Sequence, residues 1–160
     1  MLNLKIENYF KLVLSISLIS IIIAYYIEHI LGHKPCNLCL IERIPYGLSI
    51  FLVILNFFLK RDVKFFIFLL ILIFIFSFII SVYHFGIEQG FFQESAVCGL
   101  KDASEILSKE ELLKHLSKNI ISCKDVTFRV FGLSLTTINI GLSLFLIILS
   151  IKSFTNYEKI

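Results

Sequence analysis

Charged residues are scarce in this sequence. Only 17% of its 160 residues are charged, whereas 58% are hydrophobic, and the mean hydropathy is +0.90. Soluble domains are about one quarter charged and roughly half apolar, so the composition excludes an ordinary soluble domain. The formal net charge is only +3, and no basic patch is interleaved with aromatic residues, so nothing in the sequence indicates nucleic-acid binding.

Regular alternation of apolar and polar residues is also absent, which argues against a transmembrane β-barrel. The hydrophobic residues instead form continuous runs of roughly 20 residues, the length at which a helix crosses about 30 Å of hydrocarbon. These runs lie at about residues 12–31, 40–59, 65–85 and 131–151. The sequence therefore predicts an all-α membrane protein in which residues 1–160 form a single domain, a bundle of four transmembrane helices.

No cleavage site of the small-x-small type follows the first run, which is also too long for the apolar core of a signal peptide. We therefore expect this run to remain as the first span. Basic residues divide almost evenly between the two sides of the bundle, but those next to the span ends, such as Lys11 and Lys64, favour cytoplasmic termini. All four cysteines then face the opposite side, which in a bacterium is the periplasm, where disulfides form and persist.

A long polar segment, residues 86–130, separates the third and fourth runs and is predicted to be a periplasmic loop. Within it, Ser108 and Glu111 have the spacing of a capping box, and apolar residues recur at helical spacing from Leu112 to Ile120. This pattern predicts a short amphipathic helix that lies on the membrane surface or covers the bundle.

Two cysteines, Cys36 and Cys39, stand between the first two apolar runs. Cysteines at this spacing indicate redox or metal chemistry more often than packing. A zinc site would use the pair with His33, His29 or His84, but a closed zinc site usually has a second close pair of cysteine ligands, and the sequence has no second CxxC. The redox interpretation is therefore preferred, because the N-terminus of a helix favours a thiolate.

Arg43 follows Cys39 by four residues and shares its face if the helix is regular. A guanidinium in that position favours a nearby anion or donates a hydrogen bond to a carbonyl oxygen. Pro45 leaves the geometry open, since its ring is incompatible with the carbonyl four residues earlier. Either the helix is kinked near Ile41, or regular helix begins at Pro45.

The other two cysteines, Cys98 and Cys123, lie in the polar loop and have no metal-like spacing. They can form a structural disulfide, which typically contributes about 2–4 kcal/mol. They can equally form a second redox pair that exchanges with the first, because their polar surroundings predict the access that a foreign thiolate needs. The residues alone leave both possibilities open.

Residues 34–43 read KPCNLCLIER and closely resemble the Pro-Cys-x-x-Cys-x-x-x-Arg signature of the disulfide-bond formation protein B (DsbB) family. Residues 83–90, YHFGIEQG, followed by Cys98, resemble the exit of that family's third span and its loop. The stretch from Cys123 to Ser134 resembles the second loop cysteine and the entry to the fourth span. The chain departs from the family in having no tryptophan, since positions that often carry Trp, such as Phe91, Phe92 and Phe128, hold phenylalanine.

This resemblance implies a four-helix thiol:quinone oxidoreductase of the bacterial inner membrane. Cys98 would be attacked by a reduced thioredoxin-like periplasmic oxidase of the DsbA type, with Cys123 as its partner. Electrons would then pass to Cys36 and Cys39. Cys39 would face a membrane quinone (ubiquinone or menaquinone), and Arg43 would polarise a quinone oxygen.

The resemblance also places His84 near the same quinone, and it implies no metal. A DsbA-type oxidase is itself a strong oxidant, at about −120 mV, so its reoxidation needs a stronger final acceptor, which a lipid-soluble quinone supplies. Two other classes of protein fit the layout. One is a thiol-fed quinone or epoxide reductase with four helices, and the other is a non-enzymatic membrane subunit with structural disulfides or a zinc site. Oxidation of a dithiol partner with free quinone, and metal analysis with thiol titration, distinguish these classes.

Overall fold

The computed structural model describes residues 2–59, 62–93, 123–124, 129–130 and 132–158. Its long helices are α1 (Leu2–His29), α3 (Ile44–Leu59), α4 (Val63–Glu88) and α6 (Leu135–Glu158). A short helix, α2 (Asn37–Ile41), precedes α3, and two short strands, β1 (Arg129–Val130) and β2 (Leu133–Ser134), precede α6.

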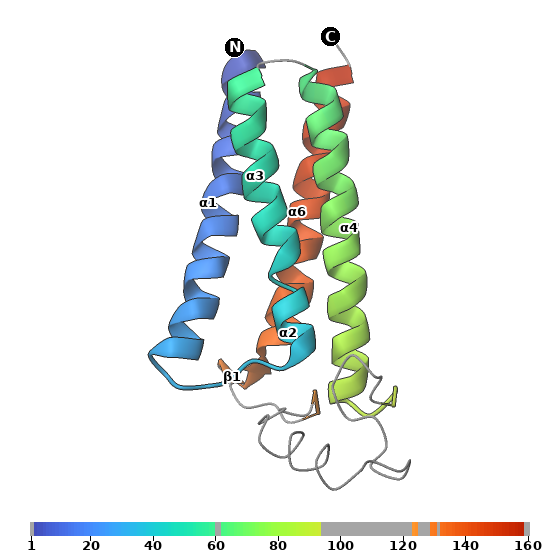
Figure 1. Ribbon diagram of the computed structural model, residues 1–160. Coiled ribbons are helices and arrows are strands. Elements are labelled where there is room, and N and C mark those ends of the chain that lie inside the picture. The colour runs from blue at the N-terminus through green and yellow to red at the C-terminus, as the bar shows by residue number, and fades with distance from the viewer. Residues whose placement is uncertain (1, 60–61, 94–122, 125–128, 131, 159–160) are drawn as a thin grey trace, which may run out of the picture.

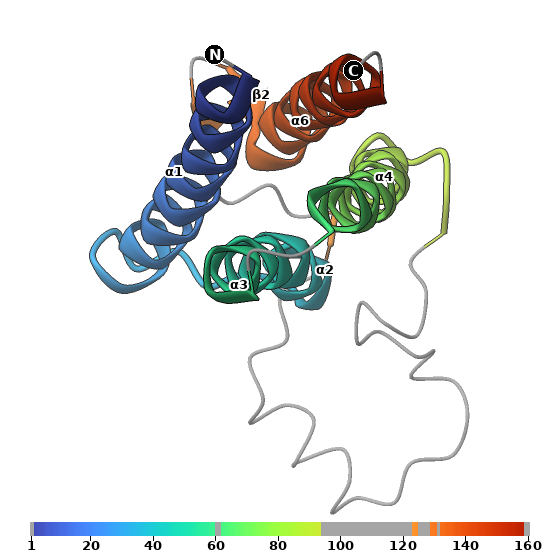
Figure 2. The ribbon, with the colours of Figure 1, turned by 90° about the horizontal axis from the view of Figure 1, so that it is seen from above.

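The long helices stand side by side as a bundle (Figure 1, Figure 2). α4 packs along α6 and α1 packs along α3, while α3 also contacts α4. With α2 and α3 taken as one span, four segments of the described chain are long and apolar enough to cross a membrane. The predicted all-α, four-span architecture is thus confirmed, and the chain is a multi-pass membrane protein. The helix ends nearest the two termini lie at one end of the bundle and α2 lies at the other (Figure 1).

The helix boundaries differ from the predicted ones at the loop end of the bundle. α4 continues to Glu88, so the third span does not end at residue 85. α6 begins at Leu135 rather than at residue 131, because β1 and β2 pair antiparallel just before it. Gly132 lies between the strands with a φ of +83°, which glycine adopts without a steric penalty. The predicted amphipathic helix at residues 112–120 lies outside the described residues.

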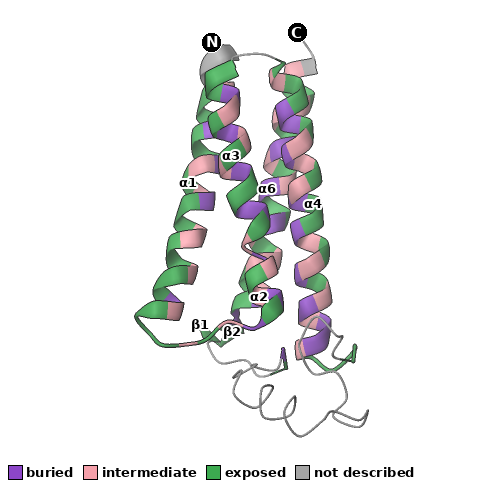
Figure 3. Ribbon diagram, in the orientation of Figure 1, coloured by how far each residue is buried: buried purple, intermediate pink, exposed green. Residues whose placement is uncertain are grey.

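The outer faces of the helices are exposed (Figure 3), and they carry many large hydrophobic side chains. Ile22 and Phe58, for example, are 63% and 82% exposed. In a protein that crosses a membrane, these faces contact lipid, whereas the buried interior is filled by side chains such as Val13, Val53 and Phe74. The bundle therefore needs no polar exterior along most of its length.

Buried hydroxyl groups connect neighbouring helices. Ser17 of α1 and Ser49 of α3 lie 2.7 Å apart, oxygen to oxygen, and Ser77 of α4 and Ser143 of α6 lie 3.0 Å apart. Small hydroxyl residues allow close approach of helices in membranes, and their mutual hydrogen bonds satisfy groups that lipid cannot. Ser17 therefore serves the packing of α1 against α3.

A break in the second span answers the question raised by Pro45. α2 ends at Ile41, Glu42 and Arg43 form a turn, and α3 begins at Ile44. Pro45 is therefore the second residue of α3, where a missing backbone N–H is tolerated. The side chains of Glu42 and Arg43, which this turn carries, are part of the site described next.

Candidate active site

Cys36 and Cys39 lie at the N-terminal end of α2. Cys36 is the N-cap residue, and its Sγ accepts a hydrogen bond from the backbone N–H of Cys39 at 3.3 Å. Both cysteines are free thiols, and their Sγ atoms are 2.6 Å apart. A disulfide bond is about 2.05 Å long, so a small movement of the side chains closes the pair. The helix terminus thus presents two sulfurs that can interconvert between dithiol and disulfide.

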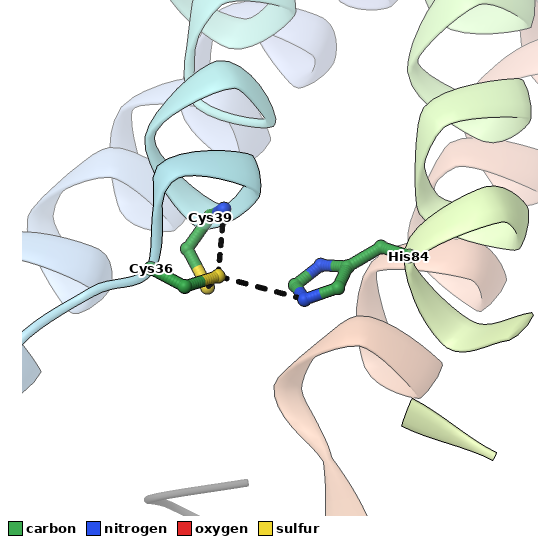
Figure 4. Close-up of side chains that lie close together, drawn as sticks. All are labelled: Cys36, Cys39 and His84. Atoms are coloured by element: carbon green, nitrogen blue, oxygen red, sulfur yellow. Dashed lines mark hydrogen bonds between the residues drawn. The ribbon is translucent and has the colours of Figure 1, made fainter. Parts of the chain in front are cut away.

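His84, from the last turns of α4, faces this pair (Figure 4). Its Nε2 lies 3.5 Å from Cys36 Sγ, and its side chain is only 2% exposed. The resemblance to the DsbB family predicted a position near the quinone for this residue. The structure brings the ring directly onto Cys36, which is a closer relationship than the sequence indicated.

The Cys36 thiol is strongly acidic in this environment. A hydrogen bond from Cys39 lowers the pKa of Cys36 to about 4, and the nearby His84 contributes in the same direction, while desolvation by burial opposes both. The contact with the Cys39 backbone N–H adds a smaller effect of the same sign. Cys36 in the reduced pair is therefore a thiolate at neutral pH, and thiolates are the reactive form of cysteine.

Glu42 connects His84 to the rest of the bundle. Its Oε1 lies 2.9 Å from His84 Nδ1, and its Oε2 accepts a hydrogen bond from Asn139 Nδ2 at 3.0 Å. Asn139 is held in turn by Ser81 Oγ, 2.7 Å from the same Nδ2, and by the Tyr46 hydroxyl, which donates to Asn139 Oδ1. These groups come from the α2–α3 turn, α3, α4 and α6, so the network fixes four parts of the bundle around the cysteine pair.

Arg43 points from the same turn toward α1. Its Nη1 donates to Glu28 Oε2 at 2.6 Å, and its guanidinium lies over the Tyr25 ring, 5.2 Å from the centroid. Its side chain is 18% exposed. The ion pair and the ring hold the guanidinium in a single position while leaving it at the edge of the cavity that Cys39 also lines.

The cysteine pair opens onto a cavity of about 250 Å³. One wall, made by α1 and α6, is mostly apolar and includes Ile23, Ala24 and Leu142. The polar residues that line it are Ser20, His33, Lys34, Cys36, Cys39, Glu42, Arg43, Tyr46, His84, Glu88, Cys123, Thr136 and Asn139. A cavity with an apolar wall and convergent polar groups opposite a reactive centre is typical of a small-molecule site.

Cys123 lies next to the cysteine pair rather than out in solvent. It is disulfide-bonded, only 3% exposed, and packs in one cluster with Cys36, Leu38 and Ile87. The expectation that both loop cysteines are accessible is therefore wrong for Cys123, because this residue is covered by the ends of α2 and α4. Cys98, its expected partner, lies outside the described residues.

Sequence reasoning missed several polar residues of the site, namely Glu28, Glu42, Glu88, Thr136 and Asn139. A signal for them existed, because ionisable residues inside membrane spans are rare and usually functional. Glu42 stood within the quoted cysteine motif and Glu88 within the quoted end of the third span. The partners of Glu42, which are His84 and Asn139, lie on other helices, and no spacing rule along one helix relates them.

Comparison with known proteins agrees with the resemblance in the sequence. The family model described as disulfide bond formation protein DsbB matches residues 7–152. A curated relative from Rickettsia prowazekii (strain Madrid E), described as uncharacterized protein RP370, is 31% identical over 141 residues. That alignment covers 84% of this chain and 80% of the relative. No solved structure matches the chain.

Proposed function

The chain belongs to the disulfide bond formation protein DsbB family, and from this premise we propose that it oxidises a thioredoxin-like periplasmic dithiol protein of the DsbA type and passes the electrons to a membrane quinone. Membership of the family implies a membrane disulfide oxidoreductase. One observation supports electron transfer to a quinone in particular. Cys36, Cys39 and Arg43 line the same cavity, at one end of a membrane bundle.

The cavity suits the ring of a quinone. Its volume of about 250 Å³ is near the lower end of small-molecule sites, which are roughly 300–1,000 Å³, so it suits one substituted ring better than a flavin or a dinucleotide. Arg43 offers a fixed hydrogen-bond donor for a ring oxygen, and the apolar wall of α1 and α6 would contact the ring face. A quinone bound there would accept two electrons and two protons from the reduced cysteine pair.

The loop disulfide would be the entry point for electrons. A thiolate of the partner attacks Cys98, which breaks the Cys98–Cys123 bond and releases the Cys123 thiolate. The second thiolate of the partner then attacks the mixed disulfide, so that the partner leaves oxidised and Cys98 is released as a thiol. The burial of Cys123 supports Cys98 as the atom attacked, because a foreign protein cannot reach a sulfur that is 3% exposed.

The reduced loop pair would then transfer its electrons inward. Cys123 shares a buried cluster with Cys36, so its thiolate can attack Cys36 in the Cys36–Cys39 disulfide and release Cys39. Attack by Cys98 on the resulting Cys36–Cys123 bond restores the loop disulfide and leaves both inner cysteines reduced. The described arrangement, with Cys36 and Cys39 free and Cys123 disulfide-bonded, corresponds to the product of this step.

We further propose that the cysteines face the periplasm of a bacterial inner membrane and that the termini are cytoplasmic. The helix ends nearest the termini lie at one end of the bundle and α2, whose N-terminal end carries the cysteine pair, lies at the other (Figure 1). This geometry supports a protein that keeps all its thiol chemistry on one side of the membrane. The oxidising periplasm is the compartment in which such chemistry produces lasting disulfides.

The experiment uses the purified protein with a reduced thioredoxin-fold dithiol partner and soluble ubiquinone or menaquinone analogues. We expect the loss of quinone absorbance to match the loss of partner thiols, and Cys39→Ser to abolish both. Unchanged turnover in Cys39→Ser would overturn the mechanism. In a single turnover without partner, the pre-reduced Cys98→Ser, Cys123→Ser double variant should still reduce a stoichiometric amount of quinone, which separates the inner reaction from the outer one.

A further inference from the structure

We propose that the reduced Cys36–Cys39 pair forms, with His84 and Glu88, a site for Zn²⁺ that is abolished when the two cysteines form a disulfide. The sulfurs of both cysteines and a ring nitrogen of His84 lie within 4.8 Å of one another (Figure 4). Thiolate and imidazole ligands in a four-coordinate site select zinc over cations such as Ca²⁺ and Mg²⁺, which prefer oxygen.

The distances between the donor atoms fit zinc after one small movement. Zn–S and Zn–N bonds of about 2.3 and 2.05 Å at a tetrahedral angle place sulfur and nitrogen about 3.6 Å apart. Cys36 Sγ and His84 Nε2 are 3.5 Å apart. Two sulfurs on one zinc ion would be about 3.8 Å apart, so the present 2.6 Å separation must open by rotation of the less buried Cys39.

Glu42 supplies the support that a zinc-binding histidine normally has. Histidine ligands almost always donate their other ring N–H to a carboxylate or carbonyl, which fixes the tautomer and the ring orientation. His84 Nδ1 lies 2.9 Å from Glu42 Oε1. The Nε2 atom is thereby left as the ligand atom, and it is the atom that faces Cys36.

Glu88 provides the second, independent indication of a cation. It lies one turn beyond His84 on α4, with Oε1 4.0 Å from His84 Nε2, and its side chain is only 6% exposed. Oε1 accepts a hydrogen bond from Thr136 at 2.6 Å, but Oε2 is buried and has no hydrogen-bond partner among the residues that the structure describes. A buried carboxylate oxygen without a partner carries a desolvation penalty. If Glu88 Oε2 bound a zinc ion held by the two sulfurs and His84, that penalty would be removed. Glu88 would then be the fourth ligand of the ion.

Binding of zinc and formation of the disulfide exclude each other. Zinc requires both sulfurs as thiolates and displaces their protons, whereas a disulfide offers no thiolate. Binding itself is independent of the proposed function. Its consequence for turnover rests on that function: zinc would hold the pair reduced and block the transfer of electrons to the quinone.

The test uses the reduced, quinone-free protein in detergent. It is titrated with Zn²⁺ in competition with a chelating indicator, and separately with Co²⁺, whose absorption spectrum reports its ligands. We expect stoichiometric uptake, a thiolate-to-cobalt charge-transfer band, and loss of both after oxidation of the pair. Cys39→Ser should abolish the band, and Glu88→Gln should weaken Zn²⁺ binding at least about tenfold. Glu7→Gln, the same change at an exposed residue of α1 outside the site, should leave binding unchanged.

The Cys98→Ser, Cys123→Ser double variant should also retain binding. Absence of uptake by the reduced protein, equal uptake by the oxidised protein, or loss of uptake in the double variant would overturn the site. Zinc binding without quinone reduction would leave the site standing and contradict the proposed function. Quinone reduction without zinc binding would contradict the site alone.

Discussion

His84 Nδ1 lies 2.9 Å from Glu42 Oε1, although the two residues are 42 positions apart in the chain. An ionised carboxylate can only accept a hydrogen bond, so Nδ1 carries the proton and the ring presents Nε2 to Cys36. This contact joins α4 to the turn between α2 and α3, and it makes Glu42 a positioning residue that acts on the cysteine pair through His84.

Replacement of Glu42 by Gln should slow quinone reduction by about tenfold to a hundredfold, which is below the full effect of a general acid or base, about 10²–10⁴-fold. The amide has the size of the carboxylate but carries no charge, so it weakens the hydrogen bond that holds the His84 ring against Cys36. Steady-state turnover measures the change, and the pH midpoint of Cys36 alkylation should rise in parallel. Glu7→Gln, at an exposed residue that pairs with Lys11, is the matched control. An unchanged rate and midpoint in Glu42→Gln would remove the positioning role.

The acidity of Cys36 predicts an unusual pH profile for its alkylation. In the reduced protein the rate should remain near its maximum down to about pH 5 and fall with a midpoint near 4, whereas an ordinary thiol has its midpoint near 8.5. His84→Ala should move the midpoint upward, because it removes a hydrogen bond and a charge that favour the thiolate. Mass spectrometry of Cys36 after brief exposure to iodoacetamide gives the profile, and a midpoint above 7 in the unmodified chain would contradict it.

The same shift has a consequence for stability and redox balance. The pKa of Cys36 is lower in the folded than in the unfolded chain, so the stabilisation of the reduced folded form is fully present above about pH 8.5. It is lost progressively as the pH falls toward the folded pKa of about 4. A stabilised reduced form makes a cysteine pair a better electron acceptor, which helps it to receive electrons from a strongly oxidising partner.

The sequence predicted the four-span architecture because an apolar span is a local signal, and the role of the cysteine pair stays a prediction from an equally local signal. A run of about 20 apolar residues is enough by itself to indicate a membrane span. Cys36, Cys39 and Arg43 likewise lie within a single motif of the sequence. The entry to α6 was predicted too early, because hydropathy does not detect the short hairpin that occupies Arg129 to Ser134.

The network behind the cysteines could not be predicted in the same way. Glu42, His84 and Asn139 come from three different elements, and their contacts depend on how the helices are rotated about their axes. Hydropathy along a span does not indicate which face of the helix points inward, because the face that contacts lipid is as apolar as the face that packs in the core. The burial of Cys123 likewise depends on contacts with α2 and α4 that polar loop sequence does not indicate.

Arg43→Ala should raise the KM for quinone about tenfold to a hundredfold, because a charge-assisted hydrogen bond contributes about 1.5–3 kcal/mol. Arg43→Lys should recover only part of this, since a lysine cannot reproduce the planar fork or its stacking on Tyr25. Glu28→Gln removes the ion pair of Arg43 but keeps the guanidinium, so it should raise the KM for quinone by less than Arg43→Ala does. Steady-state kinetics over a range of quinone concentrations measure all three variants, and an unchanged KM in Arg43→Ala would exclude a role for this residue in binding quinone.

The contact between Ser17 of α1 and Ser49 of α3 predicts a stability effect without an effect on chemistry. Both side chains are fully buried, and because Ser49 donates to the Tyr46 carbonyl at 2.8 Å, Ser17 donates to Ser49. Hydrogen bonds between membrane helices contribute about 0.6 kcal/mol on average and at most about 1.7 kcal/mol. We expect Ser17→Ala and Ser49→Ala to lower the free energy of unfolding, with a coupling in this range in a double-mutant cycle.

Unfolding in mixed micelles, followed by circular dichroism, measures these free energies. Ser15→Ala, on the exposed face of α1, is the matched control and should leave the free energy of unfolding unchanged. Turnover of the Ser17 variant should match that of the unmodified chain at low denaturant, since Ser17 does not line the cavity. A coupling free energy of zero would show that these two hydroxyls contribute only their small size to the packing of α1 on α3.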